Sequence, residues 1–135
     1  MKISNRTPHT LLIDGERVPV DPPPIRLPFA DMEEVYGLPF PAVRANAHSL
    51  AVAADAAQEI LDDGGDLVLV ARLVLDVLLQ HAHRDADIAR ALSRVASPDT
   101  SPTSAVRDAE GRITGVRRIV IAPVSAGLGP REAYR

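Results

Sequence analysis

The sequence contains no cysteine and no tryptophan, and its aromatic side chains are limited to two Phe and two Tyr. The absence of thiols excludes disulfide bonds, thiolate catalysis and cysteine-ligated zinc, and it fits a reducing compartment. With so few aromatic rings, the core has to be built from Leu, Val, Ile and Ala. We therefore expect a cytoplasmic protein whose interior packs through aliphatic side chains.

Long apolar segments and a strong net charge are also missing. Residues 1–6 lack an apolar signal core, and the apolar run at 67–71 is far too short to span a bilayer. The net charge is −3, so no overall basic field supports general nucleic-acid binding. We expect no membrane or general nucleic-acid partner, and any anion site must be a local group of cations.

The length of 135 residues suits one domain, 1–135, with a loosely ordered tail over 125–135. Apolar residues at helical spacing predict three helices, over 48–62, 72–81 and 85–92. An alternative for the second is that a preceding strand continues to Leu79. In that second predicted helix, Arg72 stands at or near the first turn.

Several β-strands are indicated between and around these helices. Asp14-Gly15 predicts a hairpin that joins strands near 9–13 and 16–20, with Pro19 confining the second strand to an edge. The run at 67–71 is typical of a central strand buried on both faces. One or two short strands are expected within 25–46.

Two loops are predicted from the proline-rich segments. Residues 37–41 are expected to form a loop that tucks Leu38 and Phe40 against the core, and 97–104 a surface loop. Together these elements predict an α+β fold, in which the N-terminal and C-terminal hairpins join strand 67–71 in one mostly antiparallel sheet. Two main helices would pack on one face, and the exposed strand edges predict a homo-oligomer.

The densest cluster of arginines surrounds a turn near the C-terminus. Asp108 and Gly111 suit a type I turn, which places Arg107 and Arg112 across from each other. Such like charges are unfavourable unless acids or a bound anion neutralise them. Residues 107–112 are therefore predicted to form either a hairpin neutralised by its own acids or part of an anion site.

Arg117 extends this cluster along the following strand. If that strand runs unbroken from Arg112 to Ala122, alternation places Arg117 on a face with isoleucines, where it needs an acid or a ligand. Gly115, two residues earlier, would let a neighbouring backbone or ligand approach closely. The resulting candidate ligand-binding residues, for a phosphate or carboxylate, are Arg107, Arg112, Arg117, Arg72 and His9.

The string His81-x-His83-x-Asp85 resembles the metal-binding string of metallo-β-lactamase-type hydrolases. That family's pattern asks for another histidine directly after the aspartate, where this sequence has Ala86. If the segment is helical, His81 and His83 point in different directions and do not share a metal. The favoured interpretation is a polar helix end, and no metal site is predicted.

Three segments together resemble a group of small phage- and prophage-associated proteins that have no assigned activity. These are Asn5-Arg6-Thr7-Pro8-His9, the strand and Arg-led helix over 68–79, and Arg107-Asp108-Ala109-Glu110-Gly111-Arg112-Ile113-Thr114-Gly115. The sequence departs from the group at Arg6, often aliphatic there, at Val116, frequently Cys there, and in an insertion over 46–62. The resemblance implies a phage setting, in which small cytosolic single-domain proteins are often counter-defence factors, including sponges that sequester nucleotide signals.

Three functional hypotheses follow. The first is a non-catalytic binding module without a cofactor, taking an anionic small molecule such as a nucleotide signal. The second is a protein-interaction or assembly factor whose hairpin arginines pair with acids on a partner. The third is a metal-dependent hydrolase at His81, His83 and Asp85. We favour the first, because the sequence shows no nucleophile and base in a recognisable context.

Overall fold

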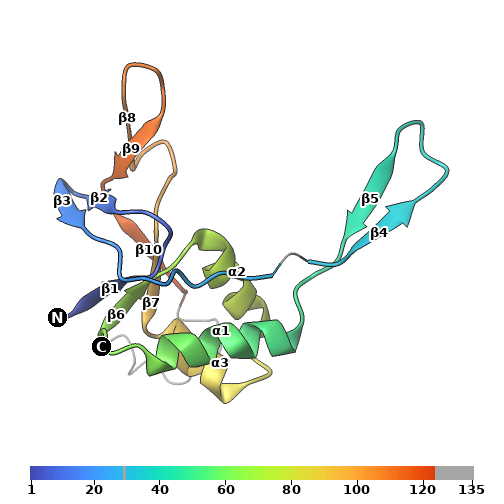
Figure 1. The fold of residues 1–135 in the computed structure, drawn as a ribbon, viewed down its shortest axis with the longest axis horizontal. Coiled ribbons are helices and arrows are strands. Elements are labelled where there is room, and N and C mark those ends of the chain that lie inside the picture. Colours follow the sequence, from blue (N-terminus) through green and yellow to red (C-terminus); the bar gives the residue numbers. More distant parts are fainter. Residues whose placement is uncertain (29, 124–135) are drawn as a thin grey trace.

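The computed structural model describes residues 1–28 and 30–123 (Figure 1). Within these residues the fold is α+β, as predicted, with three helices and three small sheets. The expected tail over 125–135 lies outside the described residues. The two predicted hairpins and strand 67–71 do not share one sheet, so that part of the predicted arrangement is wrong.

The central sheet has the strand order β1-β6-β7-β10. Strands β1 (Ile3–Asn5), β6 (Leu67–Leu69) and β7 (Val95–Pro98) are parallel, and β10 (Ile119–Ile121) runs antiparallel to β7. The predicted central position of the run at 67–71 is confirmed, because β6 has a partner on each side. Strand β7 is not predicted by the sequence. The loop expected over 97–104 is wrong at its start, because Ser97 and Pro98 belong to β7.

Three helices are observed close to their predicted positions: α1 (Leu50–Asp62), α2 (Arg72–His81) and α3 (Ala86–Leu92). The Ser49 hydroxyl caps α1 and the Asp85 carboxylate caps α3, as such side chains commonly do. The alternative strand reaching Leu79 is wrong. No helix in the described part of the chain combines the length and apolarity needed to cross a membrane.

The helices share one core with the inner residues of the central sheet, and Figure 1 shows them gathered beside it. The fully buried side chains in this core are aliphatic, as the sequence predicts. They include Ile60 from α1, Leu78 from α2, Ile88 and Leu92 from α3, and Val68 and Val95 from the sheet. Burying a side chain of this size stabilises the fold by about 1.5–3 kcal/mol.

A second sheet has the order β3-β2-β9-β8 and contains both predicted hairpins. It is formed by β2 (Leu11–Ile13), β3 (Glu16–Val18), β8 (Ala105–Arg107) and β9 (Ile113–Val116). Strands β2 and β9 join the hairpins side by side. A Cβ on Gly115 would lie 3.0 Å from the Leu12 carbonyl oxygen, so this glycine permits the close approach that the sequence suggested.

The two sheets are linked by a short crossing between β9 and β10, at Arg117 and Arg118. The buried Ser104 hydroxyl accepts hydrogen bonds from both of their backbone N–H groups, each at 3.1 Å. The predicted unbroken strand from Arg112 to Ala122 is therefore wrong. Because the chain leaves the ladder here, the Arg117 side chain is exposed instead of lying on an apolar strand face.

A third, two-stranded sheet projects from the body as an arm. It consists of β4 (Met32–Val35) and β5 (Ala42–Ala45), and Figure 1 shows it extending well away from the helices and the other sheets. The expected short strands within 25–46 are thus confirmed. The expectation that the connecting loop packs on the core is wrong, because Leu38 and Phe40 are exposed by 59% and 76%.

Stability at acid pH is expected to depend on the Asp99 carboxylate, which lies beside the crossing between β9 and β10. A hydrogen bond from Arg118, with a second from the Ser101 backbone, lowers the pKa of Asp99 to about 2. The unfolded chain has the higher pKa, so the stabilisation is present above about pH 4 and is lost as the pH falls towards 2.

Asp99→Asn should therefore lower the denaturant midpoint at pH 7 and show a shallower decline between pH 5 and pH 2 than the wild type. Asp55→Asn, at an exposed carboxyl on α1, is the control. Equal declines in the wild type and Asp99→Asn would show that the Asp99–Arg118 pair adds nothing to stability.

Candidate functional site

The segment from Asn5 to His9 forms a loop at the carboxyl end of β1, held by one buried side chain. Asn5 Nδ2 donates to the carbonyls of His9 and Val18, each at 3.0 Å. Asn5 Oδ1 accepts from the Thr7 backbone N–H at 3.0 Å and lies 2.6 Å from Thr7 Oγ1. All of the amide's polar atoms are therefore used inside the protein, and the loop has a defined shape.

Arg6, in the same segment, connects this loop to other parts of the fold. Its guanidinium donates to the Pro23 carbonyl and to Asp63, in a pair that is mostly buried. Burial alone raises the pKa of Asp63, but hydrogen bonds from Ser4, Gly65 and Arg6 outweigh it and hold the pKa below its usual value. The Arg6 charge is neutralised by the pair.

A cavity of about 170 Å³ lies beside this loop, next to the carboxyl ends of β1, β6 and β7. We call it the Arg72 pocket. Its polar lining residues come from separate elements: Thr7 and His9 from the loop after β1, Arg72 from α2, and Ser97 and Thr100 from β7 and the loop that follows. Residues far apart in the sequence therefore meet here because adjacent parallel strands end at the same edge.

The N-terminus of α2 opens at this pocket. Ala71, the N-cap residue, offers no side-chain hydrogen bond, and the first turn carries no acid. Val74 and Leu75 donate to the Ala71 carbonyl, whereas the N–H groups of Arg72 and Leu73 lie ahead of the first helical bond. An uncapped helix start of this kind favours a negative charge.

Ser97 forms part of the pocket's lining and has a polar atom without a partner. The residue is 0% exposed, and within the described part of the chain its Oγ makes no hydrogen bond. An unsatisfied buried hydroxyl costs about 1–3 kcal/mol. The pocket therefore brings together the uncapped start of α2 and a buried hydroxyl that has no partner among the described residues.

Arg72 and His9 complete the pocket. Arg72 Nε lies 3.0 Å from Asp76 Oδ1, but both side chains are about half exposed, so this pair is weak and the guanidinium can turn to a ligand. His9 is exposed, and its backbone carbonyl, not its ring, is used by Asn5. None of the residues that line the pocket is acidic, and the one acid paired with its fixed cation is Asp76, on the next turn of α2.

A second cavity of about 320 Å³ adjoins the pocket, and we call it the Thr114 groove. The two share His9, Leu11, Pro98 and Thr100 as lining residues. The groove continues over β2 and β9, where it is lined by Thr10, Leu12, Ile113, Thr114, Gly115 and Val116. Its volume alone reaches the lower end of the range for ligand sites, roughly 300–1,000 Å³.

The structure divides the five residues that the sequence singled out. His9 and Arg72 line the same pocket. Arg107 donates to the Gly111 carbonyl, and Arg112 lies 3.6 Å from an Asp108 carboxylate oxygen, so both are engaged inside their own hairpin. Arg117 lines a different cavity, on the open face of the central sheet.

The turn that carries the hairpin arginines forms as predicted. Asp108 Oδ1 accepts from the backbone N–H groups of Glu110 and Arg112, and Gly111 adopts a φ of 82°. Arg107 pairs across the ladder with Ile113, not with Arg112. The clash of like charges across the turn is therefore avoided by register, without a bound anion.

The histidine string is divided by the end of α2. His81 is buried and its Nε2 lies 2.8 Å from the His48 carbonyl, whereas His83 is exposed beyond the helix. The expected polar helix end is therefore only partly exposed. Among the described residues, no group of three or more His, Asp or Glu side chains is arranged to hold a metal ion.

Sequence reasoning missed Thr7, Ser97 and Thr100 as site residues. Thr7 lies inside the motif that was noticed, but its role depends on the Asn5 amide, which only the fold reveals. Ser97 was assigned to a loop because Ala-Ser-Pro is a weak strand pattern next to a Ser, Thr and Pro-rich segment. The apolar Val95, which stands between the end of the third helix and that segment, is the one signal in the sequence that could have indicated a strand here.

Comparison with protein-family models finds no match, and neither does comparison with curated proteins or with solved structures.

The buried Asn5 amide is expected to be essential for the shape of the pocket loop. Asn5→Ala leaves two carbonyls and the Thr7 N–H without their partner and should lower the free energy of unfolding by about 2–3 kcal/mol. Chemical denaturation measures this, with Asn46→Ala, at an exposed position, as the control. An equal, small effect of both substitutions would contradict the assigned role.

Proposed function

We propose that this protein is a non-catalytic binding module for a phosphate-bearing small molecule, such as a nucleotide signal, with the phosphate in the Arg72 pocket. The observation that carries the proposal is the meeting of an uncapped helix start with the unpartnered Ser97 hydroxyl in one cavity. A phosphate oxygen accepts hydrogen bonds from both kinds of donor at once.

The hydrogen-bond donors around the pocket support an anionic ligand. Arg72 supplies a planar guanidinium, which suits bidentate contact with phosphate, and His9 adds a second donor at the opening. The adjoining Thr114 groove presents aliphatic and hydroxyl side chains, which suit the less polar remainder of a nucleotide. The two cavities together therefore match a molecule with one charged end.

Binding without turnover is favoured by the surroundings of Ser97. A serine nucleophile needs a base within hydrogen-bond reach, and in the described residues the Ser97 hydroxyl has no such partner. The proposed role of Ser97 is to donate to the bound phosphate. The hydrolase alternative has no support in the geometry of His81 and His83.

The resemblance to phage-associated proteins gives this binding a setting. The Asn-x-Thr-Pro-His signature that carries the resemblance includes Thr7, Pro8 and His9, which line the Arg72 pocket. In a phage setting, the proposed activity is sequestration of a nucleotide signal in the host cytoplasm. The alternative, an assembly factor acting through hairpin arginines, is less well supported because Arg107 and Arg112 are engaged within the hairpin.

Thermal shift with a panel of phosphate compounds tests the proposed ligand class. The panel contains inorganic phosphate, mononucleotides, cyclic nucleotides and cyclic dinucleotides, each nucleotide paired with its nucleoside. At least one phosphate compound should raise the melting temperature while its nucleoside does not, because binding to the native state stabilises it by mass action. No stabilisation by any member would overturn the proposal.

Substitution of Arg72 locates the site of any binding found. Arg72→Ala removes a charge-assisted hydrogen bond, worth about 1.5–3 kcal/mol, and should weaken binding by roughly tenfold or more in calorimetry. The control is Arg112→Ala, at an exposed arginine of the hairpin. The reverse pattern, with Arg112→Ala as the damaging change, would assign the ligand to the hairpin instead.

Ser97→Ala is expected to separate stability from binding. The substitution removes a buried hydroxyl that has no partner, so the free energy of unfolding should stay the same or rise by about 1 kcal/mol. Ligand affinity should fall, because one donor to the phosphate is lost. Destabilisation of the free protein together with unchanged affinity would refute a binding role for Ser97.

A further inference from the structure

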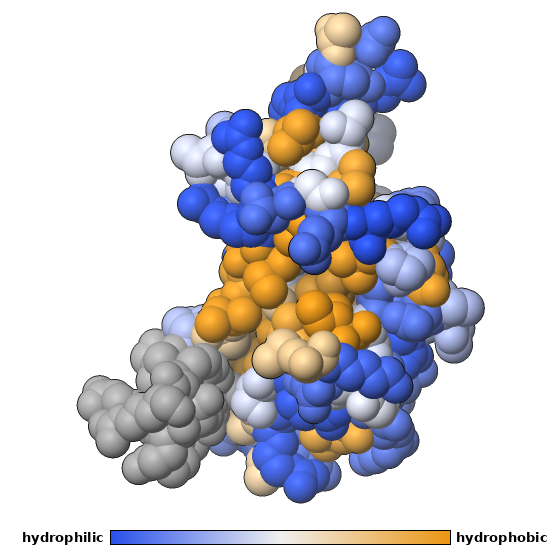
Figure 2. All heavy atoms as spheres, turned by 90° about the vertical axis from the view of Figure 1, so that its left-hand side faces the viewer, coloured by the Kyte–Doolittle hydropathy of each residue, from blue (hydrophilic) through white to orange (hydrophobic). Residues whose placement is uncertain are grey.

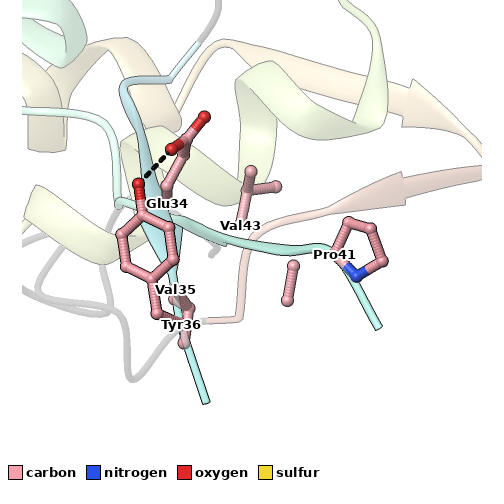
Figure 3. A pocket seen from close by; sticks show the side chains of 6 residues that line it. Glu34, Val35, Tyr36, Pro41 and Val43 are labelled. Atoms are coloured by element: carbon pink, nitrogen blue, oxygen red, sulfur yellow. Dashed lines mark hydrogen bonds between the residues drawn. The ribbon is translucent and has the colours of Figure 1, made fainter. Parts of the chain in front are cut away.

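The arm formed by β4 and β5 presents an apolar face without a cover. The register places Met32 opposite Ala45 and Glu34 opposite Val43, so these side chains share one face. Figure 3 shows Glu34, Tyr36 and Val43 close together at the shallow pocket of this face. Met32, Tyr36 and Val43 are exposed by 64%, 83% and 58%, which is unusual for large apolar side chains that lie together.

An isolated two-stranded hairpin is marginally stable in water. This arm has one ion pair, Arg44 with Glu33, and that pair is well exposed and therefore weak. The hydrogen bond from the Tyr36 hydroxyl to Glu34 is likewise at the surface. A second surface that covers Tyr36 and Val43 would therefore stabilise the arm.

A matching surface lies on the open face of the central sheet, opposite the helices. Figure 2 shows a broad hydrophobic area there, between two polar regions. It contains a groove of about 350 Å³, which we call the sheet-face groove. Its floor is formed by Ile3, Leu67, Leu69 and Ile119, and Ile13, Glu16 and Val18 from the second sheet close one side.

The charges at the two surfaces are complementary. Arg117 lines the sheet-face groove, and its guanidinium has no ion-pair or hydrogen-bond partner among the described residues. The neighbouring Arg118 is already paired with Asp99. On the arm, Glu34 is the one charged side chain on the face that it forms with Met32, Val43, Ala45 and Tyr36. The groove is also lined by one acid, Glu16, but no ion pair joins Glu16 to Arg117 among the described residues, so Arg117 is the cation available to Glu34.

The arm does not reach the groove of its own chain. In Figure 1 the arm extends to the right of the body, whereas β1, β3 and β6, which border the groove, lie on the left. The face seen in Figure 2 is that left-hand side. An arm from a second copy is therefore the occupant that the arrangement favours.

We infer that two copies of this chain associate by exchange of arms, with Tyr36 and Val43 of each arm docked in the sheet-face groove of the other copy and Glu34 paired with its Arg117. The interface is isologous, because each copy supplies one arm and one groove. It lies apart from the Arg72 pocket, so its test is independent of the proposed ligand.

Sedimentation velocity over a concentration series tests this dimer on the full chain. A dimer should be populated at about 100 μM or below, a concentration that fills even modest interfaces. Glu34→Arg and Arg117→Glu should each raise the dimer dissociation constant by about tenfold or more, and the two substitutions together should restore it. A monomer at every concentration, or a double variant no better than the single ones, would overturn the inference.

Cross-linking locates the contact, because the native chain has no cysteine. A mixture of Val43→Cys and Ile3→Cys chains, treated with a short bis-maleimide, should give a cross-linked dimer. A mixture of Val43→Cys and Leu73→Cys, whose leucine is 55% exposed on α2, is the matched control and should not. A cross-link formed only within one chain of the Val43→Cys/Ile3→Cys double variant would show that the arm covers its own groove and would refute the exchange.

Discussion

The carboxamide of Asn5 is the interaction on which the candidate site depends most. It stands at the carboxyl end of β1 in the central sheet, and it bonds to Val18 at the end of β3 in the second sheet. The same side chain holds the loop of Thr7 and His9 over the pocket. One buried amide therefore joins two sheets and shapes one wall of the cavity, which is why the site and the fold are not separable here.

The Arg72 pocket brings together an uncapped helix start and a buried hydroxyl that has no partner among the described residues. α1 and α3 have side-chain caps, but α2, whose start opens at the pocket, has none. Ser97, on the adjacent β7, is buried without a partner although nearby buried Asn5 and Thr7 are fully used. Natural proteins often lack a helix cap or a hydrogen-bond partner at functional sites, where a ligand can supply the missing contact. Two such missing contacts, at the uncapped start of α2 and at the Ser97 hydroxyl, meet at this pocket, and the proposed phosphate would satisfy both, whereas the buried Nδ1 of His81, which also has no partner among the described residues, lies elsewhere on α2.

Local patterns predicted most of the secondary structure and part of the site. Periodicity and capping residues placed the helices, and Asp14-Gly15 and Asp108 to Gly111 placed two turns, because these signals act over a few residues. The two hairpins form a sheet of their own because the chain changes direction at Arg117, where the Ser104 hydroxyl accepts a hydrogen bond from the backbone N–H. These two residues are 13 positions apart, so patterns of neighbouring residues do not predict the interaction. The pocket also depends on contacts between distant residues. The sequence therefore indicates His9 and Arg72 as single candidates without placing them together, and it does not indicate Ser97 at all.

The proposed phosphate site is at the start of α2. Amide chemical shifts in a ¹⁵N-labelled sample, titrated with the phosphate compound that stabilises the protein best, test it most directly. We expect the largest shifts at the amides of Arg72, Leu73 and Ser97, and unchanged shifts at the amides of 107–112. Shifts confined to the 107–112 hairpin, with the start of α2 unaffected, would contradict it.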